Sequence, residues 1–189
     1  LDVRRTNTHS VIGSRSFSKN SKTVSILGKL CINLYQKNKI ATVIKHIPGH
    51  GASKLDSHKK LPVIQLPKKN LLKNDFKAFV GCNSHFAMTA HIIYSCIDKK
   101  NTATHSKLLI KNIIRKFIGF RGILISDDVS MKALRFDVIT NVRKSLAAGC
   151  NLVLHCNANI NEMNKIAKIV PYIDSFTVKK TSDFYKFLG

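Results

Sequence analysis

The 189-residue chain lacks any apolar run of the roughly 18 to 20 residues that a membrane helix needs. Its N-terminal stretch, LDVRRTNTHSVIGSRSF, also lacks the apolar centre of a signal peptide. Apolar residues nevertheless make up 44% of the chain and recur along its length, so the composition of a disordered protein is absent as well. The sequence therefore predicts a folded, soluble protein of the cytoplasm, with no membrane partner.

Paired cysteines are a second absence. The five cysteines are an odd number, they are scattered, and no C-x-x-C pair occurs. This pattern argues against a disulfide framework and against a cysteine-based zinc site. Reduced and mostly buried thiols are expected at Cys31, Cys82, Cys96, Cys150 and Cys156.

Acidic residues are scarce. Ten Asp and Glu stand against 32 Lys and Arg, which gives a formal net charge of +22. Such a charge raises nucleic acid as a partner, because phosphate contacts dominate that kind of binding. The basic residues are spread over the whole length without an aromatic-rich basic motif, so no nucleic-acid partner is predicted.

Strand-like and helix-like patterns alternate along the chain. Short apolar, β-branched runs bounded by Gly, Pro, Asn or Asp predict strands over residues 40–47, 85–94, 122–126 and 151–156. Helical spacing of apolar residues predicts helices over about 24–34, 109–117, 136–148 and 161–169. Continuous apolar strands joined by helices imply a parallel sheet, so the predicted class is α/β.

Polar residues gather where the predicted strands end. In parallel α/β folds the chemistry lies just beyond the carboxyl ends of the strands. The residues found there are Lys45 and His46, then His91, then Asp127 and Asp128, and then His155 to Asn157.

The stretch IKHIPGHGASKLDSH, residues 44–58, is the densest of these groups. A metal site is one interpretation, since His46, His50, Asp56 and His58 are all possible ligands. The Pro-Gly turn between the first two histidines prevents them from sharing a helix face, which weakens that interpretation. The alternative is acid–base chemistry, in which Asp56 accepts a hydrogen bond from one ring nitrogen of His58 and the other nitrogen exchanges protons. A loop histidine with only a structural hydrogen bond is the third possibility.

Two further motifs carry candidate functional groups. GILISDDVSM ends a predicted strand with Asp127 and Asp128, which places one carboxylate at the functional edge while its neighbour caps or braces it. A purely structural pair is an equal alternative. VIGSRSF places Arg15 in a Gly/Ser loop just after an LDV segment that is expected to finish a strand, and a solvated loop arginine is the alternative there.

In order along the chain, the motifs LDV, VIGSRSF, KHIPGHG, DSH, MTAHIIY, GFRGILISDDVSM and AAGCNLVLHCN resemble the bacterial cytoplasmic β-N-acetylhexosaminidases of glycoside hydrolase family 3. The likeness runs from Leu1 to about Pro171. It implies a (β/α)8 barrel that removes terminal N-acetylglucosamine from muropeptides in peptidoglycan recycling, by a retaining mechanism without metal or cofactor.

The resemblance also implies a role for each matching residue. Asp127 would be the nucleophile, and His58 would be the general acid/base with Asp56 completing the dyad. The substrate-binding residues that it implies are Arg15, Lys45 and His46.

The sequence departs from the family pattern at its start. A complete barrel has about 250 residues, and neither strands one to three nor a D-Q-E-G-G-R-type loop is present. Residues 1–189 are therefore expected to be the C-terminal part of a single barrel domain, with strands four to eight. A fragment, a decayed gene, and half of a split enzyme completed by a separate N-terminal barrel fragment are the three explanations. An inactive remnant or sugar-binding protein is the alternative function.

Overall fold

A parallel sheet forms the centre of the molecule, as the sequence predicted. The computed structural model describes residues 1–57 and 60–189. In the main sheet the strands run in the order β1 (Val43–Ile47), β3 (Phe86–Thr89), β5 (Ile123–Asp128) and β6 (Leu152–Leu154), all parallel. A second small parallel sheet pairs β2 (Val63–Ile64) with β4 (Ile93–Tyr94).

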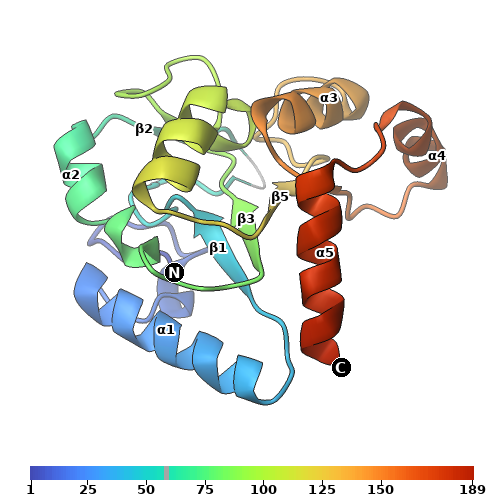
Figure 1. The fold of residues 1–189 in the computed structure, drawn as a ribbon. Helices are drawn as coiled ribbons and strands as arrows, with labels where there is room; N and C mark the ends of the chain where they lie inside the picture. Colours follow the sequence, from blue (N-terminus) through green and yellow to red (C-terminus); the bar gives the residue numbers. More distant parts are fainter. Residues whose placement is uncertain (58–59) are drawn as a thin grey trace.

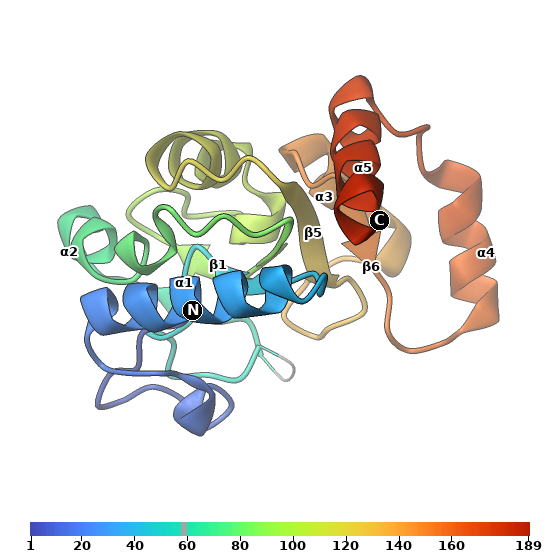
Figure 2. The ribbon, with the colours of Figure 1, turned by 60° about the horizontal axis from the view of Figure 1, so that its bottom comes forward.

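Helices follow or precede these strands. The α-helices are α1 (Ser21–Lys37), α2 (Lys68–Lys73), α3 (Val138–Ala148), α4 (Ile160–Ile169) and α5 (Ser175–Leu188). A π-helix, η4 (Leu109–Phe117), precedes β5, and three short 3-10 turns are η1 (Gly13–Arg15), η2 (Lys77–Phe79) and η3 (Ala103–His105). Figures 1 and 2 show α5 standing beside the main sheet and α4 at the outer margin of the molecule. Over the described residues, no helix combines the length and the apolar character needed to cross a membrane.

Helix boundaries have local causes. The Asn20 side chain accepts hydrogen bonds from the backbone N–H groups of Lys22 and Thr23, which begins α1. Asp137 caps α3 in the same way, and Gly149 ends that helix with φ of 117°, a left-handed conformation that favours glycine. The sequence prediction that α3 ends at Gly149 is confirmed.

The core lies between the main sheet and the helices that flank it. Its largest side chains are less than 2% exposed and include Phe76, Phe79, Tyr94, Leu109 and Leu124. A smaller apolar cluster lies beneath α3 and α4. Both clusters hold the strands rigidly, so the residues at the strand ends have fixed positions.

Several predicted boundaries differ from the structure. The run 85–94 is two strands, because the chain leaves the main sheet after Thr89 and pairs again through β4 with β2. The LDV segment forms no strand: the Leu1 amino group donates to the Lys45 carbonyl beside β1, but the segment makes no ladder with that strand. The elements α2, α5 and β2 were not predicted. In α5 the residues Thr, Val, Ser and Asp are poor helix formers, so helical spacing alone gave a weak signal.

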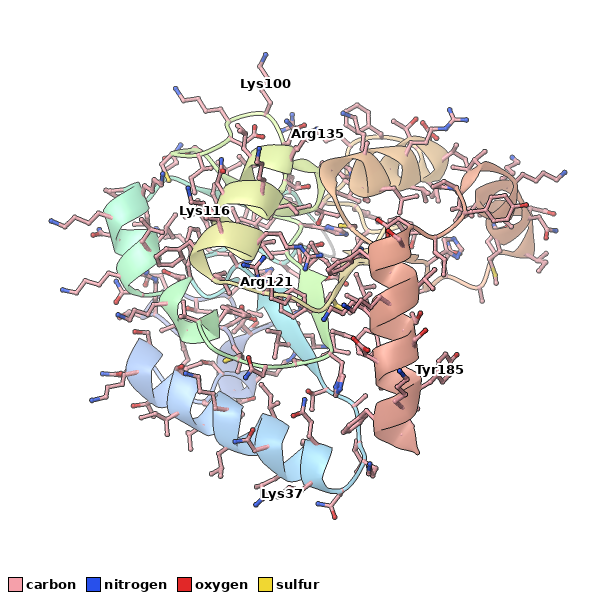
Figure 3. The ribbon with its side chains drawn as sticks, in the orientation of Figure 1. Lys37, Lys100, Lys116, Arg121, Arg135 and Tyr185 are labelled. Atoms are coloured by element: carbon pink, nitrogen blue, oxygen red, sulfur yellow. The ribbon has the colours of Figure 1, made fainter. Side chains whose placement is uncertain are left out.

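Exposed apolar side chains occur on the elements that precede or follow the two edge strands of the main sheet in sequence. Among the described residues, β1 and β6 are the edge strands and do not pair with each other. On the β1 side the exposed apolar residues are Ile26, Leu30, Leu34, Tyr35, Ile40 and Val43. On the β6 side they include Tyr172, Ile173 and Tyr185, and Figure 3 shows Tyr185 projecting outward from α5.

Basic side chains are distributed around the molecule. The residues Lys37, Lys100, Lys116, Arg121 and Arg135 come from α1, η4 and loops between other elements, and Figure 3 shows them at separate places on the molecule.

Candidate active site at the carboxyl edge of the sheet

The end of β1 presents the first candidate residues. The pairing of β1 with β3 shifts between Ile44 and Ile47, so three steps along β1 oppose two along β3. Bulges of this kind redirect side chains next to functional sites. At this irregularity Lys45 is exposed and His46 is buried, and the peptide bond between them is cis.

A buried carboxylate organises the turn after β1. Asp2 is 6% exposed and accepts the ring Nδ1–H of His46 at 2.8 Å. It also accepts the backbone N–H of His50 at 2.6 Å and that of His46 at 3.3 Å. A carboxylate only accepts, so His46 carries its proton on Nδ1. None of the hydrogen bonds formed among the described residues reaches Nε2 of His46, which leaves that nitrogen for a ligand.

His50 links this turn to the following loop. Its side chain is buried, and its Nε2 lies 3.2 Å from the Ser57 hydroxyl. The turn itself is fixed by the buried Tyr94 hydroxyl, which donates to the Gly49 carbonyl at 2.6 Å. His50 and Tyr94 therefore tie the loop that carries Asp56 to the end of the sheet.

The end of β5 carries the aspartate pair. Asp127 is half-buried, and its carboxylate accepts the backbone N–H of Asp128 at 2.9 Å. The carboxylate of Asp128 accepts from the Ser130 hydroxyl at 2.7 Å and from the Cys156 backbone N–H at 3.2 Å. Asp128 thus braces β5 against the segment after β6, which leaves Asp127 as the carboxylate of the pair available to a ligand.

His91 joins the ends of β3 and β5. It is fully buried, its Nε2 lies 2.9 Å from the Asp128 backbone carbonyl, and its Nδ1 lies 2.7 Å from the Thr104 hydroxyl. The Thr104 hydroxyl in turn lies 2.8 Å from that of Thr89.

The pKa values of the buried histidines His50 and His91 and of the buried carboxylate of Asp2 are all lowered, but for different reasons. Burial lowers the pKa of both His50 and His91, while the charge of Asp127 opposes the shift in each case. Asp127 therefore lies within interaction range of both rings. Burial alone would raise the pKa of Asp2, but the hydrogen bond and charge of His46 hold it well below its usual range. At neutral pH the cluster combines the ionised Asp2 carboxylate with uncharged His50 and His91 rings.

The remaining predicted site residues are placed less closely together. Arg15 and Lys45 line one hollow of about 380 Å³ between α1 and the start of β1. Asp56 is half-buried in the loop before β2, and its carbonyl accepts the Lys60 backbone N–H at 3.0 Å. His58 lies outside the described residues, so the predicted dyad of Asp56 and His58 stays a prediction.

A second hollow adjoins this loop. It measures about 650 Å³ and is lined by the N-terminal segment around Arg5, by residues 51–55 and by residues 62–66. Within residues 1–57 and 60–189, no three His, Cys, Asp or Glu side chains are grouped as metal ligands.

Sequence reasoning passed over two residues of this cluster. Asp2 was treated only as part of a strand end, and His91 only as a polar residue at such an end. The signal for Asp2 was the scarcity of acidic residues, since only ten occur in the chain. No local signal marked the partners of His91, because they come from other segments.

The comparisons with known proteins agree in the family that they indicate. The model of the glycosyl hydrolase family 3 N-terminal domain matches residues 1–181. A protein named beta-hexosaminidase from Actinobacillus succinogenes is 36% identical over 152 residues, which are 77% of this chain and 44% of that protein. Another beta-hexosaminidase, from Psychromonas ingrahamii, is 30% identical over 181 residues, 93% of this chain and 51% of that protein.

A solved structure shows the same arrangement of elements. NagZ from Neisseria gonorrhoeae, in complex with N-trifluoroacetyl-D-glucosamine, superposes with a TM-score of 0.86 at 28% identity. The match covers 97% of this chain and 53% of that chain. The present chain thus spans about half the length of the relatives that it matches.

Proposed function

Because the chain belongs to glycosyl hydrolase family 3, we propose that it supplies the catalytic groups of a retaining exo-β-N-acetylglucosaminidase. The names of its relatives support this activity, since they are beta-hexosaminidases, and the NagZ structure holds an N-acylated glucosamine. The substrate that we propose is the terminal N-acetylglucosamine of muropeptides, released during peptidoglycan recycling in the cytoplasm.

The reaction follows a double displacement. The Asp127 carboxylate attacks the anomeric carbon and forms a glycosyl ester while the bond to the leaving oxygen breaks. His58 protonates that oxygen, with Asp56 keeping its ring basic. The neutral His58 then takes a proton from water, which attacks the anomeric carbon, releases the sugar and regenerates the Asp127 carboxylate.

The observation that carries this proposal is the convergence of groups around Asp127. Its carboxylate lies at the carboxyl edge of a parallel sheet, where ligands bind in α/β folds, and its charge opposes the lowering of the pKa of His50 and His91. Both rings are kept uncharged by burial, so no buried cation neutralises the nucleophile from that side. Nε2 of His46, together with Lys45 and Arg15, would bind sugar hydroxyls.

We also propose that the open sheet is part of one (β/α)8 barrel domain, with the other strands supplied by further polypeptide. The unpaired edge strands β1 and β6, and the exposed apolar residues of α1, of β1 and of the segments that follow β6, support this, because barrel closure would pair these edges and cover apolar surface beside them. Either further residues of the same polypeptide or a separate N-terminal fragment would supply the other strands.

Release of nitrophenol from a nitrophenyl N-acetyl-β-glucosaminide tests the activity, first with the 189-residue chain and then with an added N-terminal half from a relative. Turnover is expected in at least one of these two preparations. Asp127→Asn should abolish both turnover and formation of the covalent intermediate, detected as a mass increase on the intact protein. Asp183→Asn, a change on the exposed face of α5, is the matched control.

Absence of turnover in both preparations would reject the proposed enzyme and favour a sugar-binding remnant. In that case isothermal titration with N-acetylglucosamine would still detect binding. Turnover that survives Asp127→Asn would instead reject the role of that carboxylate while leaving the activity in place.

A further inference from the structure

The contacts of His91 favour one arrangement of protons in the hydrogen-bond chain that runs through its ring. The Asp128 backbone carbonyl can only accept, so Nε2 of His91 must carry a proton. Burial lowers the pKa of this ring, although the Asp127 charge and the bond to Asp128 oppose the shift, and the ring is neutral. Nδ1 therefore has a lone pair and must accept from its neighbour.

The remaining protons follow from this assignment. Thr104 has a single hydroxyl hydrogen and two acceptors within reach, Nδ1 of His91 at 2.7 Å and the Ala90 backbone carbonyl at 3.2 Å. The shorter contact favours donation to Nδ1 of His91. The Thr104 oxygen can then accept the Thr89 hydroxyl at 2.8 Å. The chain of donors thus runs in one direction, from Thr89 through Thr104 and His91 to the Asp128 carbonyl. Donors aligned in this way polarise and strengthen one another.

This chain of hydrogen bonds lies where the backbone pairing between β3 and β5 ends. The regular pairing of β3 with β5 ends at Met88 and Ile125, and the pairing of β5 with β6 is irregular between Ile125 and Asp128. The last residues of β5 are held by other bonds. On the β6 side, the Ser126 hydroxyl accepts the Leu154 backbone N–H at 3.0 Å.

On the β3 side, His91 supplies the bond to the last residue of β5. The Asp128 carbonyl also accepts the Met131 backbone N–H at 3.1 Å, so both of its lone pairs are used. The peptide that follows Asp128, the residue next to Asp127, is therefore fixed from the β3 side and from its own turn.

We propose that His91 is a positioning residue for Asp127, which it serves as the neutral Nε2–H tautomer by holding the backbone that carries this carboxylate. The inference rests on the proposed role of Asp127 as nucleophile. A cationic ring at this position would place a second charge beside the carboxylate, whereas the neutral tautomer holds the strand without pairing with it.

The tautomer can be measured without any activity. In the 189-residue chain with ¹⁵N-labelled histidine, two-bond ¹H–¹⁵N correlations at neutral pH should show the His91 proton on Nε2 and an unprotonated Nδ1. A proton on Nδ1, or on both nitrogens, would overturn the proposal. Because this measurement uses the unaltered chain, it does not depend on whether a variant folds.

Two substitutions of His91 test separately the hydrogen bonds made by its two ring nitrogens. The amide of His91→Gln can reach the Asp128 carbonyl as a donor, whereas that of His91→Asn replaces only the Thr104 end. In the preparation that hydrolyses the nitrophenyl glycoside, His91→Asn should lower kcat on the order of 100-fold with little change in KM. His91→Gln should restore most of that loss, and His105→Asn, in the neighbouring turn η3, should change neither constant.

The outcomes distinguish this inference from the proposed function. Turnover with equal kcat in His91→Asn and the unaltered enzyme would refute the positioning role and leave the glycosidase standing. If no preparation turns over, the Asp127 carboxyl ¹³C signal replaces the kinetic readout. It should move in His91→Asn and return in His91→Gln, and an unmoved signal would refute the inference.

Discussion

Substitution of Asp2 by Asn tests the arrangement of the turn after β1. The carboxylate receives two well-formed hydrogen bonds, from His46 Nδ1 at 2.8 Å and from the His50 backbone N–H at 2.6 Å. In Asp2→Asn the amide oxygen can keep one of them, but the amide nitrogen must donate where His46 now donates. His46 would have to move its proton from Nδ1 to Nε2 to accept it.

The magnitude follows from the change in bond type. Hydrogen bonds to charged groups contribute about 1.5–3 kcal/mol and neutral ones about 0.5–1.5 kcal/mol, so two bonds lose about 2–3 kcal/mol together. The neutral amide also avoids the cost of burying a charge, which brings the expected loss to about 2 kcal/mol. Asp2→Ala would leave three buried donors without an acceptor, at about 1–3 kcal/mol each. That is comparable with the whole stability of a domain, about 5–15 kcal/mol.

The direction of the Asp2 pKa shift determines how its contribution to stability changes with pH. The pKa of Asp2 in the folded chain lies below its ordinary value, because the bond and charge of His46 outweigh the opposing effect of burial. Its stabilisation is therefore complete well above the unfolded pKa of about 3.9 and declines as the pH falls below it. The stability gap between the unaltered chain and Asp2→Asn should be about 2 kcal/mol at pH 6 and should narrow toward pH 3.

Urea unfolding followed by circular dichroism at pH 6 and pH 3 measures this gap. Asp183→Asn, which removes the charge of a side chain that is 51% exposed and lies 4.0 Å from Lys180, should show a gap near zero at both values. A gap for Asp2→Asn that stays constant between the two pH values, or that is absent at pH 6, would refute the assignment of Asp2 as an ionised acceptor. Histidine ¹⁵N spectra would show independently whether the His46 proton leaves Nδ1.

Two further substitutions test the loop that follows β1. Tyr94→Phe removes the donor at 2.6 Å from the Gly49 carbonyl and should cost about 1–2 kcal/mol in urea unfolding, while Tyr172→Phe at a fully exposed position should cost nothing measurable. Gly51→Ala would place a Cβ 1.8 Å from a backbone oxygen of the N-terminal segment and should cost about 3 kcal/mol. Gly28→Ala meets the tip of one flexible side chain inside a helix and should stay within about 1 kcal/mol of the unaltered chain. Equal losses in the two glycine variants would contradict the close approach at Gly51.

Individual strands and residues show which features of the fold can be predicted from the local sequence pattern. Apolar runs located β1, β5 and β6 to within about three residues, because a strand buried on both faces needs a continuous apolar sequence. The same reasoning joined β3 and β4 into one strand, since periodicity within 85–94 cannot show which sheet each half pairs with. The five cysteines form no disulfide in the structure, but Cys96 and Cys156 are exposed, against the expectation of mostly buried thiols.

The sequence by itself determined the α/β class, the alternation of strands and helices that implies a parallel sheet, and the position of Asp127 and His46 at strand ends. Those features depend on spacing between neighbouring residues, which a sequence displays directly. Only the tertiary structure decided that Asp2 fixes the His46 proton and that His91 holds the Asp128 carbonyl, since these partners lie 44 and 37 positions apart. A hydrogen bond requires two groups within about 3 Å, and packing of the core alone brings such distant groups to that separation.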